Sequence, residues 1–246
     1  MVPTLQQAVA AALLGTLLGP ALARFATAQI AALDSRAGSR QRGLEIGEAL
    51  QRCRAAGLAV PRHWCWTHTA VLALALGGGW LLGGGGAAGL YLALAFALAS
   101  FAALLDLRAF WMPDSVTLPL FWLGLLGAAL GVAPVSPADA VLGAAAAWML
   151  TASLQGLARW RWEGPVLGDG DVRLLAACGA LTGLSGLPRF VALLVTAAVI
   201  LELVWSWAHP REPRQGQPSE QADWLPFGAA IVAAWMGSMG LAAVLP

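Results

Sequence analysis

Residues 87–106, AAGLYLALAFALASFAALLD, carry no charged side chain until the final aspartate. A bilayer core takes about 20 apolar residues per helix, so this stretch predicts a membrane-spanning helix that ends at Asp106. The rest of the chain has the same character. Of its 246 residues, 59% are hydrophobic and 11% are charged, whereas about 25% are charged in an ordinary soluble domain. We therefore expect an all-α, polytopic membrane protein. A soluble globular enzyme, a disordered chain, a disulfide scaffold and a nucleic-acid-binding protein are excluded.

About eight stretches are apolar and long enough to be membrane spans, although some are short. They run approximately over 4–23, 68–84, 87–106, 115–133, 137–158, 172–187, 189–208 and 225–245. The glycine-rich segment 77–89 predicts either a loose turn between two spans or close helix packing through small residues. This pattern divides the chain into a first helix with a long connection, 1–67, and a seven-helix membrane domain, 68–246.

The arginines indicate how these spans are oriented. All fourteen basic residues are arginine, and thirteen of them fall on one side of the membrane if the spans alternate; the exception is Arg189. Because basic residues accumulate in cytoplasmic loops, the segment 24–67 is predicted to be cytoplasmic and both termini to lie outside. Within it, apolar residues at helical spacing over 39–56 predict a short surface helix.

Acidic residues within or beside membrane spans are costly, so each needs an explanation. Asp139 falls in a predicted connection, where solvation explains it. Asp114 follows a proline and precedes an apolar span, which predicts a helix N-cap. Glu202 lies inside a span, either as a protonated or hydrogen-bonded packing residue or as part of a proton relay. Asp106 is different because a carboxylate is disfavoured at the C-terminus of a helix; an ion pair with Arg108 is the simple alternative to a chemical role.

Asp169 and Asp171 open the predicted span 172–187, where an acid suits the helix dipole and one of them could cap the helix. Their interleaving with Gly168 and Gly170 predicts a flexible turn that presents a carboxylate and lets another chain approach. If Asp171 approaches Asp106, repulsion keeps one carboxyl protonated while the other is ionised. Such a pair can hydrolyse a peptide by general acid/base catalysis, with neither a metal nor a covalent intermediate.

Three motifs carry a resemblance to a known family. The segment 106–120, DLRAFWMPDSVTLPL, resembles the first catalytic motif of type IV prepilin peptidases, and 168–180, GDGDVRLLAACGA, looks like their G-x-G-D motif. The segment 225–228, LPFG, is similar to the P-F-G signature in their last span. The motifs occur in family order on matching spans.

The resemblance implies an intramembrane aspartic endopeptidase in the bacterial inner membrane. It would cleave the leader peptide from type IV prepilins or type II secretion pseudopilins at the cytoplasmic face. Carried over by position, Asp106 and Asp171 are the catalytic pair, and Gly168, Gly170 and Asp114 support the motifs. The implied partners are these precursors and the lipid bilayer. The peptidase reaction needs no cofactor, and S-adenosylmethionine is expected only if the N-methyltransferase activity of many members is retained.

The first cytoplasmic loop departs from the family, whose members typically carry two zinc-binding C-x-x-C pairs there. Here the weak alternative is a zinc set of Cys53, His63, Cys65 and His68, whose spacing fits no standard pattern. This divergence leaves two other functions open. One is an inactive or repurposed relative that acts as a membrane assembly factor. The other is a proton-coupled transporter with a relay through Asp106, Asp171 and Glu202.

Overall fold

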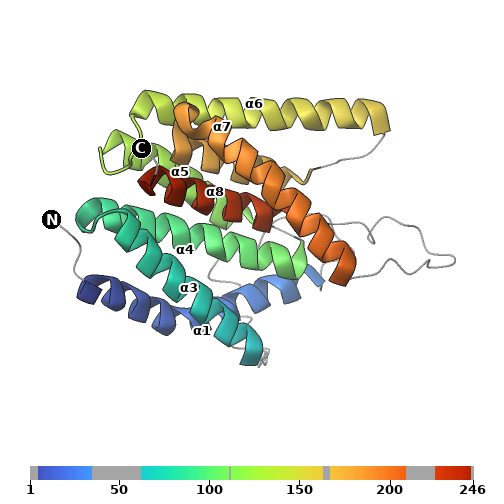
Figure 1. The fold of residues 1–246 in the computed structure, drawn as a ribbon. Helices are drawn as coiled ribbons and strands as arrows, with labels where there is room; N and C mark the ends of the chain where they lie inside the picture. Colours follow the sequence, from blue (N-terminus) through green and yellow to red (C-terminus); the bar gives the residue numbers. More distant parts are fainter. Residues whose placement is uncertain (1–4, 35–61, 111, 163–166, 209–224, 245–246) are drawn as a thin grey trace.

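A computed structural model describes residues 5–34, 62–110, 112–162, 167–208 and 225–244. Within these ranges the chain forms seven helices and no strand, which confirms the all-α prediction (Figure 1). The surface helix expected over 39–56 lies outside the described residues. The helices are α1 (Leu5–Asp34), α3 (Arg62–Leu82), α4 (Gly86–Ala109), α5 (Asp114–Ala129), α6 (Pro137–Trp162), α7 (Asp169–Ala208) and α8 (Phe227–Val244).

The helices have the length and composition of membrane spans. Six of those described are long and apolar enough to cross a membrane, and α5, with 16 residues, is shorter. At about 1.5 Å per residue α5 is roughly 24 Å long, against about 30 Å for a bilayer core. The long connection predicted over 24–67 is shorter than expected, because α1 continues to Asp34 and α3 begins at Arg62. The prediction of a polytopic helical membrane bundle is confirmed.

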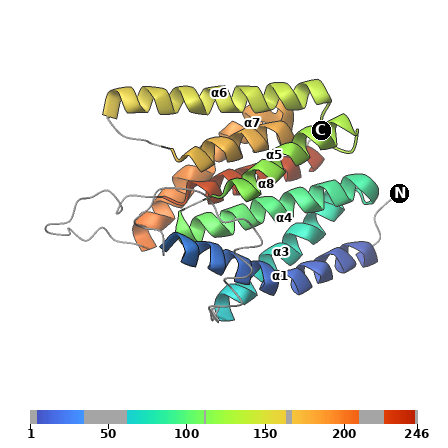
Figure 2. The same cartoon turned by 180° about the vertical axis from the view of Figure 1, so that it is seen from behind.

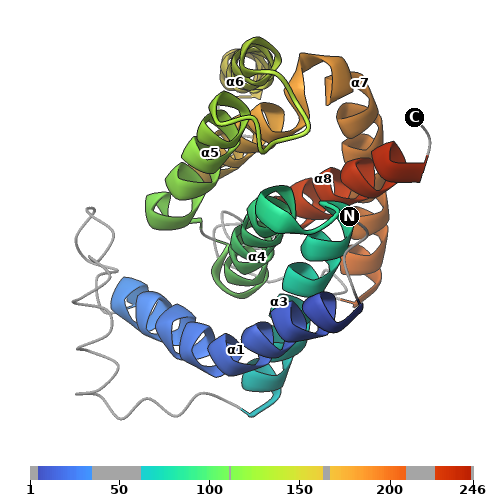
Figure 3. The same ribbon diagram turned by 90° about the vertical axis from the view of Figure 1, so that its left-hand side faces the viewer.

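The expected count of about eight helices is not exact for the described residues, because two of the predicted spans form one 40-residue element, α7, in which two helices are joined at a kink. A straight helix of this length would measure about 60 Å. Its two ends nevertheless reach the same short connection: Arg173 pairs with Asp114, and the ring of Trp205 lies 5.8 Å from that of Phe110. The helix therefore doubles back on itself, as Figures 1 and 3 show.

The reversal occurs at Gly183, not at 187–189 where the sequence predicts a break. Gly183 has φ 73° and ψ 167°, a conformation that is open to glycine because it lacks a Cβ. Asp139, in the first turn of α6, accepts hydrogen bonds from the backbone N–H of Ser185 at 3.2 Å and from its hydroxyl at 2.8 Å. Asp139 is thus a partner of the second part of α7, and its prediction as a merely solvated residue is wrong.

Both alternatives for the glycine-rich segment 77–89 apply to different parts of it. Gly79 lies within α3, where a Cβ would come within 2.6 Å of the Ala93 Cα on α4, so the glycine permits close packing. Gly84, Gly85 and Gly86 have positive φ values and form the turn between the two helices. Glycine thus permits close packing near the end of α3 and forms the turn that leads into α4.

The helices form a layered bundle, with α1 and α3 at one edge and α6 at the other (Figures 1 and 2). Between them, α4 and α8 are packed through the rings of Phe96 and Trp235, whose centroids lie 5.0 Å apart. The ends of α4 and α6, the starts of α3 and α8, and both ends of α7 lie at one end of the bundle (Figure 1). This arrangement gathers the three sequence motifs at that end.

Candidate active site

Asp106 lies in the last turn of α4 and is buried, with 5% of its surface exposed. Its Oδ2 accepts a hydrogen bond of 2.7 Å from the backbone N–H of Gly228 in the first turn of α8. The first N–H groups of a helix have no partner within that helix and carry its positive dipole end. The start of α8 therefore stabilises a carboxylate that the end of α4 disfavours.

Arg108 does not pair with Asp106, so the ion-pair alternative is wrong. The Arg108 Nη1 donates to the Thr27 hydroxyl of α1 at 3.0 Å, and its guanidinium lies 4.4 Å from the centre of the Trp64 ring on α3. These contacts turn the arginine toward α1 and α3, away from the start of α8. A hydrogen bond from the backbone, and not an ion pair with Arg108, therefore stabilises a negative charge on Asp106.

Asp114 does not cap α5, contrary to the sequence prediction. Pro113 occupies the N-cap position in an extended conformation, and Asp114 lies in the first turn without a side-chain capping bond. Its carboxylate instead pairs with Arg173 of α7. This exposed pair connects the starts of two helices that carry the first and second motifs.

Asp171 lies in the first turn of α7 and holds the G-x-G-D turn together. Its Oδ2 accepts a hydrogen bond of 3.1 Å from the Gly168 N–H, and its own N–H donates to the Gly168 carbonyl at 3.0 Å. The first bond is the half of a capping box in which the N3 side chain accepts from the N-cap N–H, and the second is a backbone turn bond, because Gly168 has no side chain. The capping role that the sequence left open for this pair of acids is therefore filled by one oxygen of Asp171.

Gln155 of α6 is a site residue that the sequence analysis missed. It is buried, and its Nε2 donates to the Leu167 carbonyl at 2.9 Å and lies 3.4 Å from Asp169 Oδ1. Both partners flank Gly168, so the amide anchors the turn that positions Asp171. The sequence could have indicated this residue, because Gln155 is a polar amide within the apolar stretch 137–158.

The three motifs meet around Met112, which is buried in the connection between α4 and α5. A Cβ at Gly170 would lie 3.0 Å from the Met112 Cβ, and one at Gly228 would lie 2.8 Å from the Met112 sulfur and 2.9 Å from Asp106 Oδ2. Glycine at both positions permits this close approach. Asp171 directly follows Gly170, and Asp106 binds Gly228, so the segments that hold both aspartates pack against Met112. The structure thus brings together the two aspartates that the sequence singled out.

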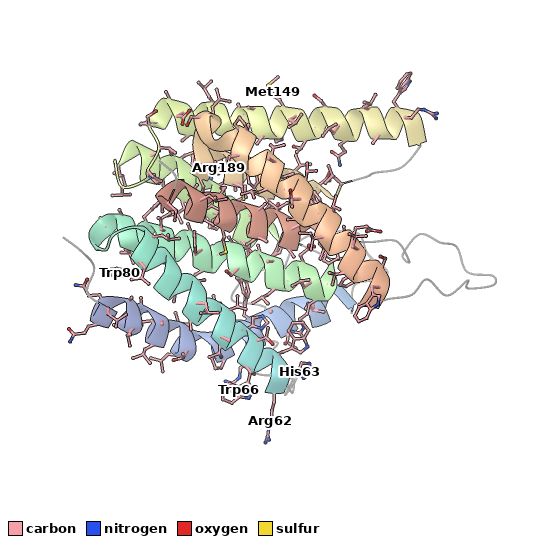
Figure 4. All side chains as sticks on the ribbon, viewed as in Figure 1. Arg62, His63, Trp66, Trp80, Met149 and Arg189 are labelled. Carbon is pink, nitrogen blue, oxygen red and sulfur yellow. The ribbon has the colours of Figure 1, made fainter. Side chains whose placement is uncertain are left out.

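The described part of the proposed zinc set does not form a metal centre. His63, Cys65 and His68 all lie on α3, and the buried His68 donates through Nδ1 to the Trp64 carbonyl at 2.8 Å. Cys53 lies outside the described residues. Among those described, no three His, Cys, Asp or Glu side chains are grouped closely enough to hold a metal ion. Figure 4 shows His63 near the start of α3, beside Arg62 and Trp66.

Glu202 is exposed on the second part of α7. It lies within a helix that is long and apolar enough to cross a membrane, and its interpretation as a protonated or hydrogen-bonded residue of a span stays a prediction. A relay from the aspartates through Glu202 is not supported by the contacts of the aspartates, since Asp106 bonds to α8 and Asp171 to its own helix turn. The site consists of two carboxyl groups and the backbone groups that hold them.

Fold and site together define a polytopic helical membrane protein in which two carboxyl groups meet at one end of the bundle. Residues 92–205, which include both aspartates, match the model of the type IV leader peptidase family. The resemblance seen in the sequence motifs is thereby confirmed.

Relatives with the name prepilin leader peptidase/N-methyltransferase support the same assignment. The protein from Pectobacterium carotovorum is 32% identical over 127 residues, which are 52% of this chain and 44% of that protein. The protein from Burkholderia pseudomallei is 34% identical over 156 residues, or 63% of this chain and 50% of that protein. The Klebsiella pneumoniae protein is 40% identical over 96 residues, or 39% and 42%. The chain spans about half the length of the curated relatives it matches. No solved structure matches it.

Proposed function

We propose that this chain is an intramembrane aspartic endopeptidase that removes the leader peptide from type IV prepilin or pseudopilin precursors. The observation that carries the proposal is the packing of Gly170 and Gly228 against Met112, which brings the turn of Asp171 and the start of α8 that binds Asp106 to one place at the end of the bundle. The family match over 92–205 and the names of the relatives support the substrate class.

The chemistry follows from two carboxyl groups that repel each other and therefore hold one proton between them. The ionised carboxylate takes a proton from a water molecule, whose oxygen attacks the scissile carbonyl carbon. The protonated carboxyl gives its proton to the carbonyl oxygen, and the resulting intermediate collapses with transfer of a proton to the leaving amine. The peptide bond and one water molecule become a carboxylic acid and an amine. Hydrogen bonds from Gly228 and Gly168 fix the two carboxyl groups during these transfers.

We place the aspartates at the cytoplasmic face of the bacterial inner membrane. The predicted connections that hold most of the arginines border the ends of α1, α6 and α7, and the ends of α6 and α7 lie at the aspartate end in Figure 1. Basic residues favour the cytoplasmic side. Precursors made in the cytoplasm would then present their leader directly to the site.

The test is co-expression with a prepilin or pseudopilin precursor in cells that lack their own leader peptidase, followed by the size of the precursor. We expect the wild-type chain to shorten the precursor and Asp171→Ala to leave it at full length while still inserting into the membrane. Complete processing by Asp171→Ala would overturn the mechanism. An unprocessed precursor with the wild-type chain would favour the inactive assembly factor.

Methylation of the new N-terminus is a separate proposal, and S-adenosylmethionine would be needed for it alone. Mass spectrometry of the mature N-terminus measures it directly, because one added methyl group changes the mass of the N-terminal peptide. A methylated product would show that this activity persists despite the divergent first loop.

A further inference from the structure

An apolar groove lies between α6 and the two parts of α7. Its volume is about 310 Å³, and its walls include Leu150, Leu154, Phe190, Leu194, Val195 and Val199. Thr151 is the one polar side chain among the lining residues, and its hydroxyl donates to the Ala147 carbonyl of its own helix at 2.8 Å. The groove therefore offers apolar contact and no spare hydrogen-bonding side chain.

The groove ends beside the two aspartates. Leu167, Leu175 and Phe227 belong to its lining. Leu167 directly precedes Gly168, and Leu175 lies one turn beyond Asp171 on the same face of the helix. Phe227 directly precedes Gly228, whose N–H binds Asp106. A chain that occupied the groove would thus have one end at the carboxyl groups.

Four wall residues are open to the surroundings: Leu150 is 47% exposed, Leu154 50%, Val195 59% and Val199 54%. They lie within helices that have the length and composition of membrane spans, so this opening faces the lipid side of the bundle. In Figures 1 and 2, α6 and the second part of α7 diverge toward the aspartate end. A polypeptide that enters an apolar opening of this kind must satisfy its own backbone, and it does so as a helix.

We propose that this α6/α7 groove receives an apolar helical segment of the polypeptide substrate, which enters sideways from the bilayer and delivers the adjoining peptide bond to Asp106 and Asp171. The proposal rests on the peptidase function above. A helix with its side chains is about 10–12 Å across, so we expect it to lie along the groove with one row of apolar side chains inside. Leu150, Leu154, Val195 and Val199 are then specificity-determining residues, since they favour a precursor whose scissile bond adjoins an apolar helix.

Photo-crosslinking tests the occupant. A photoreactive amino acid is placed at Leu150, or at the adjacent Met149, which is 61% exposed and does not line the groove (Figure 4). Both positions are built into the Asp171→Ala chain and co-expressed with a precursor. We expect a crosslink to the apolar segment of the precursor from position 150 and little from position 149. Adducts from position 150 to lipid alone, or to a second copy of this chain, would overturn the proposal, as would equal precursor crosslinking from both positions.

Filling the groove supplies a second test. Val195→Trp narrows it, whereas Ile200→Trp changes a residue of the same helix that is 56% exposed and does not line it. Losing the contact of one buried apolar side chain should slow cleavage of the membrane-embedded precursor by ~10-fold or more in Val195→Trp. Cleavage of a short soluble peptide that spans the scissile bond should be unchanged, and Ile200→Trp should leave both reactions unchanged.

These measurements separate the two proposals. If the wild-type chain cleaves neither substrate, the peptidase function fails. If the wild-type chain cleaves both and Val195→Trp cleaves the embedded precursor equally well, the groove proposal alone fails. Should Val195→Trp not insert, crosslinking from position 150 in the Asp171→Ala chain decides the matter.

Discussion

Asp106 shows how a carboxyl group can be kept at the unfavourable end of a helix. The helix dipole at the end of α4 opposes a negative charge, but the Gly228 N–H at the start of α8 donates a hydrogen bond of 2.7 Å to Asp106. Two helix ends of opposite polarity therefore meet at one side chain. The same contact explains why the P-F-G motif, far along the chain, belongs to the site.

Asp106→Asn separates this structural contact from the chemistry. The asparagine carbonyl can still accept the Gly228 hydrogen bond, but the side chain can neither take up nor give a proton at neutral pH. We expect precursor cleavage to fall by ~100-fold or more, with little change in the melting temperature of the protein in detergent. Cleavage is followed by the precursor-to-mature ratio over time. Substantial cleavage by this variant would argue against a catalytic role for Asp106.

Asp114→Ala should leave substantial cleavage, because Asp114 pairs with Arg173 at the surface and does not cap its helix. The side chains in this pair are 42% exposed for Arg173 and 57% for Asp114, and such pairs contribute about 0–1 kcal/mol. The same assay measures the effect, with Arg173→Ala as the matched variant. If Asp114→Ala abolished cleavage and Arg173→Ala did not, Asp114 would have a chemical role of its own.

The helices position the site through their ends and turns. Gln155 of α6 anchors the turn before α7 through the Leu167 carbonyl, and Gly183 lets α7 fold back so that both of its ends reach the connection between α4 and α5. Because Gln155 and Gly183 each fix the orientation of a whole helix, we expect a substitution at either residue to affect the site as well as the residue's own contacts.

Gln155→Leu removes the anchor while keeping a side chain of similar size. The Leu167 carbonyl then loses a partly buried hydrogen bond, which costs about 1–3 kcal/mol, and the turn that holds Asp171 becomes less ordered. We expect cleavage to fall by roughly ten-fold or more, measured as an initial rate. Gly156→Ala is the control, because a Cβ there would meet nothing within 4 Å. An unchanged cleavage rate in Gln155→Leu would contradict a positioning role for this amide.

Gly183→Ala should destabilise the fold of α7. The backbone has φ 73° at this residue, and a Cβ would come within 2.9 Å of the Asp139 Cγ. With ψ 167° this is a backbone region that essentially only glycine adopts, and it costs a residue with a Cβ on the order of 1–3 kcal/mol; the steric contact adds to this. We expect a lower melting temperature in detergent, with Gly240→Ala, where a Cβ would meet nothing within 4 Å, as the control. A melting temperature equal to that of the control variant would show that the reversal does not depend on glycine.

At the scale of the whole molecule, the bundle is polarised. The aspartates, the Asp114–Arg173 pair and the turns of the first two motifs lie at one end, while the Gly183 reversal and its Asp139 partner lie where α6 begins. Arg189, which the arginine pattern placed on the side opposite the other arginines, lies in the second part of α7 soon after this reversal (Figure 4). The two parts of α7 each cross between the two faces once, so both ends of α7 lie at the aspartate end.

Reporter fusions measure this polarity. We expect alkaline phosphatase to be inactive when fused after residue 162 or 208, at the aspartate end, and active when fused after residue 244. The reason is that the enzyme folds only outside the cytoplasm, and the arginine-rich connections favour the cytoplasmic side. Green fluorescent protein at the same positions should give the inverse pattern. Active phosphatase at 162 and 208 would place the aspartates on the outer face.

The sequence by itself determined the membrane class, the approximate spans and the two aspartates that carry the proposed chemistry. These follow from properties of contiguous residues: hydropathy over about 20 positions, and the polarity of a carboxylate at a helix end. Asp106 could be singled out because capping, which is a local effect, did not explain it. The family motifs were also readable as short contiguous segments.

Only the tertiary structure decided which groups those residues contact. Asp106 and Gly228 are 122 positions apart in the chain, and no local pattern fixes a contact over that distance. The errors have the same origin: Arg108, Asp114 and Asp139 were assigned to local partners or to water, whereas each contacts another helix. The α6/α7 groove likewise exists only because α7 reverses at Gly183, where the absence of a Cβ permits a backbone conformation that hydropathy does not encode.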